Sequence, residues 1–276
     1  MVQEIPFMEK MSCLGVIILK GSLWLIILLL LLCPYQAEAS FENHWIPIRI
    51  LGLGDSTSSL LLTPKVGQSL IVTERMSIQS ANLERIVIAG EKINDDFRIG
   101  FYWTRFGDSE IAPNLSYVED IKAIRGTFSV SNKLIAGVQI KKYLLQSIEN
   151  GSGFGLDLGI QASVTPKLKI GLECREIINQ MTYTTGSVER APIAIKMMAE
   201  ANFRNNTQYY ISLNDQHEIN FGFEFAVVPE LDLRAGIANG QLAGGVSLYQ
   251  NNWHIEYGLF GTELGKQQVL SLGRFF

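Results

Sequence analysis

The chain has 276 residues, of which 47% are hydrophobic and 18% are charged, and its formal net charge is −4. Average soluble proteins carry about 25% charged residues, so this composition favours a chain that meets an apolar environment. The weak net charge argues against nucleic acid as a partner. The cysteines Cys13, Cys33 and Cys174 cannot form a disulfide framework, because the first two lie in a predicted leader.

The leader occupies the first 39 residues. Lys10 and Lys20 precede the apolar run "GSLWLIILLLLLCPYQAEAS", which ends with an A-x-A site. Positive charge, an apolar stretch and this site together predict a secretory signal peptide, 1–39, cleaved after Ala39. An uncleaved membrane anchor is one alternative, because an apolar stretch of this length can span a bilayer. A lipoprotein with Cys33 as the lipidated residue is another, and the chain is exported in each case.

After residue 66 the sequence alternates between apolar and polar residues. The stretch "GFGLDLGIQASV" (153–164) alternates in this way, and "LKIGLECR" (168–175) repeats the pattern after the turn "TPK" (165–167). Successive side chains of a β-strand point to opposite faces, so a period of two predicts strands with one apolar and one polar face. No apolar period of 3.6 residues and helix length follows the leader. The alternation predicts fourteen strands: 67–76, 82–92, 97–107, 121–131, 134–147, 153–165, 167–179, 192–203, 207–214, 218–228, 231–238, 241–249, 252–262 and 267–276.

Two features favour a transmembrane antiparallel up-and-down β-barrel over a soluble β-sandwich, which also alternates and also has short turns. Short turns such as "RNNT" (204–207) roughly alternate with longer links, "GDSEIAPNLSYVED" (107–120) and "NQMTYTTGSVERA" (179–191), as in outer-membrane barrels. The polar face carries many glycines beside charges, which suits a curved and wet interior. We therefore predict an all-β barrel, 67–276, of about fourteen strands, with twelve as the alternative.

Charged side chains on the polar faces of these strands are predicted to face the lumen of the barrel. They carry both signs, so they can either brace a closed interior or line a weakly selective pore, and both readings stay open. The lumen-facing candidates are Arg98, Arg125, Lys141, Asp157, Lys169, Glu173, Arg175, Glu224, Arg234, His254 and Glu256.

The C-terminus "VLSLGRFF" ends in Phe276, with Leu272 and Leu270 in phase behind it. Bacterial outer-membrane strands commonly end in such a pattern, which the barrel-assembly machinery reads, so this machinery is a predicted partner. Arg274 stands where an apolar or aromatic residue is usual. Together with the leader, the pattern predicts a protein of the outer membrane of a diderm bacterium, in contact with outer-membrane lipid.

The central segment "SNKLIAGVQIKKYLLQSIENGSGFGLDLGIQASVTPKLKIGLECREI" resembles the PorV/PorQ-type branch of the long-chain fatty-acid transporter (FadL-like) superfamily. The matching pieces are "K-L-x-x-G-x-x-x-x-K-Y" (133–143), "G-x-G-x-D-x-G" (153–159) and "T-P-x-L-x-x-G" (165–171). Near the N-terminus, "ILGLGDSTSSLLLTPKVG" is similar to the glycine-rich opening of the family, with "LLLTPKVG" in place of the usual "W-N-P-A-G". The resemblance implies a fourteen-stranded barrel. FadL-like proteins imply passive transport, and PorV-type proteins imply a non-transporting scaffold for secreted proteins.

The segment between the leader and the barrel, 40–66, is too apolar for a solvated tail. Ile46, Ile48 and Ile50 share one face of an extended piece, and three leucines follow. In FadL-like barrels the equivalent region folds into the lumen, so the resemblance implies a short N-terminal plug-like segment packed against the inner wall. An extra strand or a periplasmic flap is the alternative.

Few residues indicate chemistry. The three histidines, His44, His217 and His254, lack metal-ligand spacing, and the sequence contains no G-x-S-x-G elbow or P-loop lysine. We predict no enzymatic activity, no catalytic or metal-binding residue and no cofactor. The preferred function is passive transport of hydrophobic or amphipathic small molecules. The alternative is a scaffold or shuttle barrel for protein secretion or surface display, and a barrel hydrolase, hinted at by His254 beside Glu256, ranks third.

Overall fold

The structure is a computed structural model that describes residues 49, 53, 57, 70–78, 83–93, 97–112, 115–204, 206–262 and 265–276. All of them belong to one compact unit, Ala37–Phe276. The predicted signal peptide and most of the predicted plug-like segment lie outside the described residues. No helix among the described residues has the length and apolar character needed to cross a membrane.

Strands form where the sequence alternates. They are β1 (Leu70–Ile78), β2 (Leu83–Ile93), β3 (Phe97–Ala112), β4 (Leu115–Ser131), β5 (Leu134–Gln146), β6 (Gly151–Thr165), β7 (Leu168–Tyr183), β8 (Val188–Glu189), β9 (Ala194–Arg204), β10 (Thr207–Asn214), β11 (Ile219–Val228), β12 (Leu231–Ala238), β13 (Gln241–Gln250), β14 (Trp253–Thr262) and β15 (Gly265–Phe275). Each of the fourteen predicted strands corresponds to one of these. The short β8, which has two residues, is an addition beside β7.

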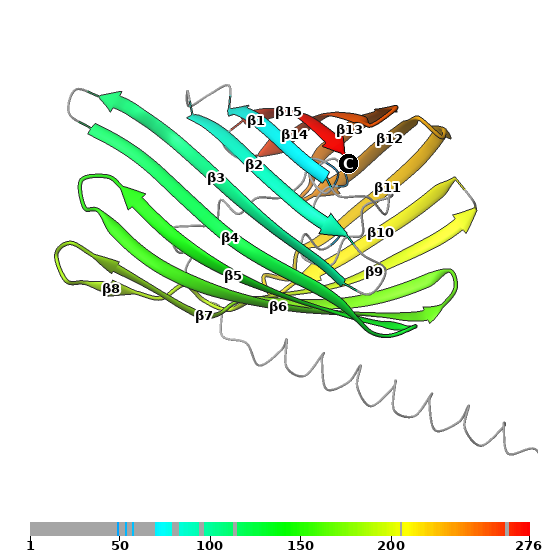
Figure 1. The fold of residues 1–276 in the computed structure, drawn as a ribbon, viewed down its shortest axis with the longest axis horizontal. Helices are drawn as coiled ribbons and strands as arrows, with labels where there is room; N and C mark the ends of the chain where they lie inside the picture. Colours follow the sequence, from blue (N-terminus) through cyan, green and yellow to red (C-terminus); the bar gives the residue numbers. More distant parts are fainter. Residues whose placement is uncertain are drawn as a thin grey trace, which may run out of the picture. The chain divides into compact units, whose positions relative to one another are not determined.

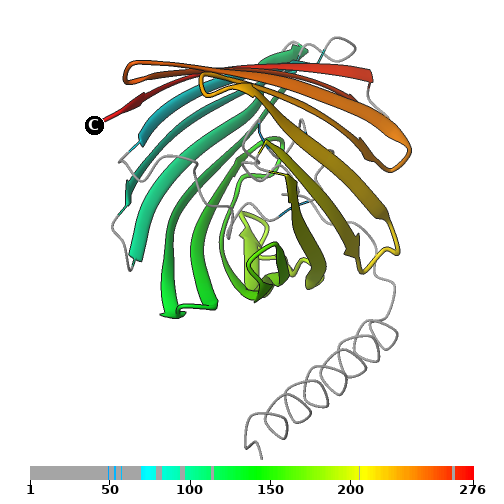
Figure 2. The ribbon, with the colours of Figure 1, turned by 90° about the vertical axis from the view of Figure 1, so that its right-hand side faces the viewer.

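The fourteen longer strands close into one ring. Each pairs antiparallel with its neighbours in the chain, and β7 pairs with both β6 and β9, so that β8 lies outside the ring. The first and last strands complete the ring, with Leu70 opposite Phe275 and Ile78 opposite Gln267. Figures 1 and 2 show the curved sheet from two sides, with β1 and β15 next to each other. The predicted antiparallel up-and-down barrel is confirmed.

Alternation along each strand separates an apolar outer wall from a polar inner wall. On β11, Phe223 exposes 43% of its surface, whereas the next residue, Glu224, exposes 1%. On β5, Ile140 exposes 62% and Lys141 exposes 1%. A soluble protein buries its large apolar side chains, and an exposed apolar surface of this extent marks a contact with lipid or another apolar partner. This is the inverted arrangement of barrels that sit in a bilayer.

The links predicted to be long are mostly strand. β3 continues to Ala112 and β4 begins at Leu115, so much of 107–120 extends the wall as a hairpin. β7 likewise continues to Tyr183, where β8 pairs with it. The predicted long link is therefore wrong at 107–120, where two residues separate β3 from β4. After β7 it is shorter than predicted but still long, because ten residues, including the two of β8, precede β9. Small and polar residues there leave no apolar alternation from which a strand can be recognised.

The outer wall leads to a prediction about charge in the apolar band. Leu158 lies at the middle of β6 and points outward, so an arginine there would enter hydrocarbon. We expect Leu158→Arg to lower the free energy of unfolding from lipid vesicles by about 2–4 kcal/mol. Ile148→Arg, in the exposed turn after β5, is the matched control and should cost about 0–1 kcal/mol. Equal costs in urea titrations of the two variants would contradict an apolar band centred on Leu158.

Candidate functional site

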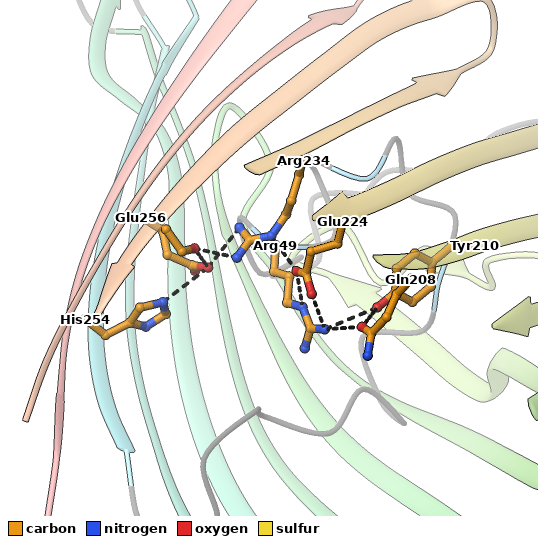
Figure 3. Close-up of polar contacts among 8 residues, drawn as sticks. Arg49, Gln208, Tyr210, Glu224, Arg234, His254 and Glu256 are labelled. Carbon is orange, nitrogen blue, oxygen red and sulfur yellow. Dashed lines mark hydrogen bonds and ion pairs between the residues drawn. The ribbon is translucent and has the colours of Figure 1, made fainter. Parts of the chain in front are cut away.

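The inner wall carries buried polar side chains in two networks. The first spans β10 to β14 and includes one residue that precedes the barrel; we call it the arginine network, and Figure 3 shows it. Its members are Arg49, Gln208, Tyr210, Glu224, Arg234, Ser247, His254 and Glu256.

Glu224 is the centre of the arginine network. Arg49 donates to both of its oxygens, from Nε to Oε2 at 2.8 Å and from Nη2 to Oε1 at 2.9 Å. Arg234 Nε donates to the same Oε2 at 2.7 Å. Arg49 Nη2 also lies 3.2 Å from both Gln208 Oε1 and Tyr210 OH, which are acceptors on the neighbouring strand β10. One carboxylate therefore holds two guanidinium groups through charge-assisted hydrogen bonds.

Arg234 extends this network to β13 and β14. Its Nη1 lies 3.0 Å from Glu256 Oε1, and its Nη2 donates to Ser247 Oγ. The Ser247 hydroxyl donates to Glu256 Oε1 at 2.6 Å. His254 Nε2 lies 3.3 Å from that same oxygen, and its ring stacks on Tyr249 with centroids 4.6 Å apart. Because Ser247 donates to Glu256, this cluster lacks the hydroxyl-to-histidine bond that activates a serine nucleophile.

Three residues of the predicted plug-like segment are described, and all three are buried. Arg49 contacts β10 and β11 through the bonds given above, and the carbonyl of Thr57 accepts a hydrogen bond from Lys196 Nζ at 3.3 Å. Leu53 is fully buried. These contacts connect the segment to the inner wall at Arg49 and Thr57, and the rest of the plug prediction falls outside the described residues.

The second network lies on β5 to β7, and we call it the lysine network: Gln139, Lys141, Tyr143, Asp157 and Glu176. Lys141 Nζ lies 2.7 Å from Asp157 Oδ1 and also pairs with Glu176. Gln139 Nε2 donates to Asp157 Oδ2 at 2.8 Å, and the Tyr143 hydroxyl donates to Glu176. The lysine is almost completely buried, so its charge depends on these two carboxylates.

Glu176 enters the lysine network because β7 bulges. Two residue steps on β6, from Leu156 to Leu158, face four steps on β7, from Ile178 to Cys174. Glu176 takes up the extra length with φ 57°, in the left-handed region, and its N–H donates to Asp157 Oδ1 at 2.9 Å. Such a conformation costs about 1–3 kcal/mol and persists where neighbouring contacts hold it.

Beyond this bulge β7 leaves β9. The ladder between them ends where Arg175 faces Ala194. Farther along β7, the Asn179 side chain replaces strand pairing: its Nδ2 donates to the Ala191 carbonyl at 2.8 Å, and its Oδ1 accepts from the Ala191 N–H at 2.6 Å. The bulge thus separates the part of β7 that pairs with β6 and β9 from a part that pairs with β6 and, at Met181 and Thr182, with β8.

The structure places the predicted lumen-facing candidates as follows. Lys141, Asp157, Glu224, Arg234, His254 and Glu256 belong to the two networks. Arg125 pairs with Glu91, Lys169 Nζ lies 3.1 Å from Glu200 Oε1, and Arg175 Nε lies 2.8 Å from Glu173 Oε1. Arg98 is half-buried on β3.

Several charged residues of the inner wall and of its contacts were missing from the sequence prediction. Glu91, Lys196 and Glu200 lie in phase with the polar faces of their strands, so the alternation that selected the others was sufficient to find them. Glu176 is out of phase, because the bulge turns it inward. Arg49 precedes the barrel, where no alternation indicates its partner.

An apolar patch covers part of the inner wall near the lysine network. It consists of Val87, Ala89, Tyr102, Ile121, Ala123, Tyr143, Leu145 and Met181, on strands β2 to β7. Ile121 faces Tyr143 across β4 and β5. Tyr143 joins patch and network, because its ring packs with the apolar residues while its hydroxyl is bonded to Glu176. We call this set the inner apolar patch; its members expose 0–7% of their surface and pack against one another.

The arrangement offers hydrogen bonding, ion pairing and apolar contact. In the part of the chain that the structure describes, no group of three or more His, Cys, Asp or Glu side chains is arranged to hold a metal ion.

Because Glu224 binds two arginines, we expect its substitution to lower the free energy of unfolding more than substitution of Arg49 does. Glu224→Gln removes the negative charge that two buried arginines share and leaves one amide oxygen for their three N–H donors, so it should lower the free energy of unfolding by about 3–5 kcal/mol. Arg49→Met should cost less, about 1–3 kcal/mol, because Glu224 keeps Arg234 as a partner. Urea titration of both variants in lipid vesicles measures the two costs. A cost for Arg49→Met that equals the cost for Glu224→Gln would contradict the central position of Glu224.

Comparisons with known proteins concern the fold. A scan against protein-family models and a search of curated proteins both find no match. Among solved structures, the chain is similar to the toluene transporter TbuX of Ralstonia pickettii, with 11% identity and a TM-score of 0.59 over 86% of this chain and 100% of that one. It is similar to the monoaromatic hydrocarbon channel CymD, with 12% identity and a TM-score of 0.54 over 76% and 88%. The toluene transporter TodX of Pseudomonas putida gives 10% identity and a TM-score of 0.51 over 81% and 95%.

At identities this low the likeness shows the fold. The fold agrees with the barrel that the predicted resemblance implied, and membership of the FadL-like superfamily and of its PorV/PorQ branch stays a prediction. The chain has the closed β-barrel fold of these hydrocarbon channels.

Proposed function

We propose that this chain is an outer-membrane barrel through which small hydrophobic molecules pass passively. The apolar outer wall supports a place in a bilayer, and the fold is that of proteins described as toluene transporters and hydrocarbon channels. The inner apolar patch carries the proposal, because the fold and the outer wall would be the same in a barrel that transports nothing.

The outer wall of β15 supports the proposed location. Leu270, Leu272 and Phe276 are exposed on one side of this strand. Arg274, which departs from the usual C-terminal pattern, lies over the rings of Trp253 and Phe276, 5.4 Å from each centroid. Cation–π contacts of this kind let a charged side chain lie beside aromatic residues at a bilayer boundary. The C-terminal strand thus keeps an apolar outer face for the proposed barrel-assembly machinery.

The inner apolar patch gives a small apolar ligand a place to bind inside the wall. Each Å² of the ligand's own apolar surface that leaves water contributes about 25 cal/mol. Tyr102 and Tyr143 are buried in the patch, so a ligand reaches their rings by separating the packed side chains. A neutral hydrocarbon gains nothing from the ion pairs of the two networks. We therefore assign binding to the patch and bracing of the wall to the networks.

Uptake measurements on two variants of β4 test this assignment. Ile121→Asn puts a polar side chain in the inner apolar patch and should lower toluene uptake about tenfold in cells that make the protein, since losing about 1.4 kcal/mol of binding is a factor of ten. Thr127→Asn changes the same strand and the same face outside the patch, so uptake should stay near the wild-type rate. Heat-modifiable migration of the outer-membrane fraction checks that both variants fold.

The uptake experiment also distinguishes transport from the alternative function. A scaffold or shuttle barrel for secreted proteins needs no passage through its interior. Cells with the wild-type protein that take up toluene no faster than cells without it would contradict transport and leave the scaffold as the better proposal.

The proposed plug-like segment predicts a change in conductance. Arg49 and Thr57 contact the inner wall, so deleting residues 40–63 should remove material from the interior and raise ion flux through barrels reconstituted in planar bilayers. Arg49→Met is the comparison variant, because it keeps the segment and removes one attachment. Unchanged flux through the deletion variant, with an intact barrel, would contradict the plug.

A further inference from the structure

One row of side chains crosses the outer wall of β3 to β7 along the strand register. The strand register places Trp103 opposite Lys122, Lys122 opposite Lys142, Lys142 opposite Phe154, and Phe154 opposite Gln180. We call these five residues the lysine row. Both lysines and Phe154 are exposed, and Trp103 and Gln180 are half-buried.

The lysine row marks the edge of the apolar outer band. The adjacent row on one side is wholly apolar: Phe101, Ile124, Ile140, Leu156 and Ile178. The adjacent row on the other side is mostly polar: Arg105, Asp120, Leu144, Ser152 and Thr182. In a barrel that sits in lipid, aromatic side chains gather at the level where the apolar band gives way to headgroups. The two lysines lie at this level.

Lys122 and Lys142 face each other without a compensating charge. Like charges directly opposite on neighbouring strands repel. Neither lysine makes an ion pair or a side-chain hydrogen bond with a residue in the described ranges. The nearby carboxylate of Asp120 faces Arg105 across the strand pair and accepts a hydrogen bond from Trp103 Nε1 at 2.9 Å. An anion bound between the lysines would remove their repulsion.

A groove opens in the outer wall at the same place. Its volume is about 800 Å³, and its walls include Phe101, Trp103, Ile124, Ile140 and Phe154 together with the two lysines. Apolar side chains line most of it, and the charged groups lie at the edge of the apolar band. A molecule that fills it needs an anionic group joined to an apolar chain.

We propose that this groove binds an anionic membrane lipid, with its phosphate between Lys122 and Lys142 and an acyl chain against Ile124, Ile140 and Phe154. Lysine holds phosphate as a compact point charge. Charge complementarity and the adjoining apolar groove favour a lipid over a free anion. The inference rests on the proposed membrane location and is independent of transport.

Trp103 is a built-in reporter for the lipid. A variant that keeps Trp103 as its sole tryptophan is reconstituted into vesicles, in which brominated phosphatidylglycerol or brominated phosphatidylcholine quenches its fluorescence. We expect a preference of about 25-fold for the anionic lipid at Trp103, because each of the two basic residues near the membrane surface contributes about fivefold. Lys122→Gln and Lys142→Gln should each reduce the preference about fivefold, and the double variant should abolish it.

Two controls separate failure of the site from failure of the location. Lys133→Gln, in the turn between β4 and β5, removes an exposed lysine outside the row and should leave the preference unchanged. A second reporter variant keeps Trp253, on the outer face of β14 at the opposite end of the barrel. Quenching of Trp253 shows that the barrel is in lipid, whichever lipid Trp103 prefers.

Four outcomes would contradict either the lipid site or the membrane location. Equal quenching of Trp103 by both lipids, with Trp253 still quenched, overturns the lipid site and leaves the membrane location intact. Quenching of neither tryptophan overturns the membrane location itself. An unchanged preference in the double lysine variant overturns the assignment to Lys122 and Lys142. Loss of the preference on adding millimolar inorganic phosphate, at constant ionic strength, shows that the lysines bind a free anion and overturns a lipid as the occupant.

Discussion

The pairing of β1 with β15 is the interaction on which the rest of the structure depends. It joins the first strand to the last along their whole shared length, from Leu70 opposite Phe275 to Ile78 opposite Gln267. An open sheet would leave two edges with unpaired backbone N–H and C=O groups, and such groups cost several kcal/mol each in hydrocarbon. Closure removes both edges, and it fixes an inside and an outside for every strand. The period of two in the sequence is then sufficient to place Phe223 outside and Glu224 inside.

Closure also brings charged side chains from many strands into a confined interior, where each needs a partner. Glu224 holds two arginines, Lys141 holds two carboxylates, and Arg125 holds Glu91. These ion pairs join neighbouring strands and brace the wall, and the excess positive charge of the first set offsets the excess negative charge of the second. Such buried pairs contribute more to the specificity of an arrangement than to net stability, because desolvation offsets much of the attraction. The inner apolar patch is the part of the wall where no such desolvation opposes an apolar ligand.

The sequence was sufficient for the fold because one physical rule, alternation, acts on every strand. It located the fourteen strands and put Asp157, Lys141 and Arg234 on the inward side of theirs. It failed where that rule is interrupted. Glu176 turns inward because a bulge of two extra residues interrupts the alternation of β7, and no local residue pattern indicates that bulge. Arg49 reaches Glu224 across 175 positions from a segment without strand alternation, and only the folded chain shows that contact. The links at 107–120 were misjudged because strands beyond the apolar band lose the apolar half of the pattern.

The bulge at Glu176 links the lysine network to the inner apolar patch. By adding residues to β7 it turns a carboxylate toward Lys141 and Tyr143, where a regular strand would direct neighbouring side chains alternately in and out. The bonded hydroxyl fixes one end of Tyr143, so its ring is held among the apolar residues of the patch rather than free to rotate toward the polar network. The pairing of β7 with β9 also ends at this bulge, and beyond it the Asn179 side chain bonds the backbone of Ala191. A local departure from ideal strand geometry thus positions the Tyr143 ring at the boundary between the charged and the apolar parts of the inner wall. A hydrophobic molecule that crosses this boundary would leave apolar contacts for charged ones.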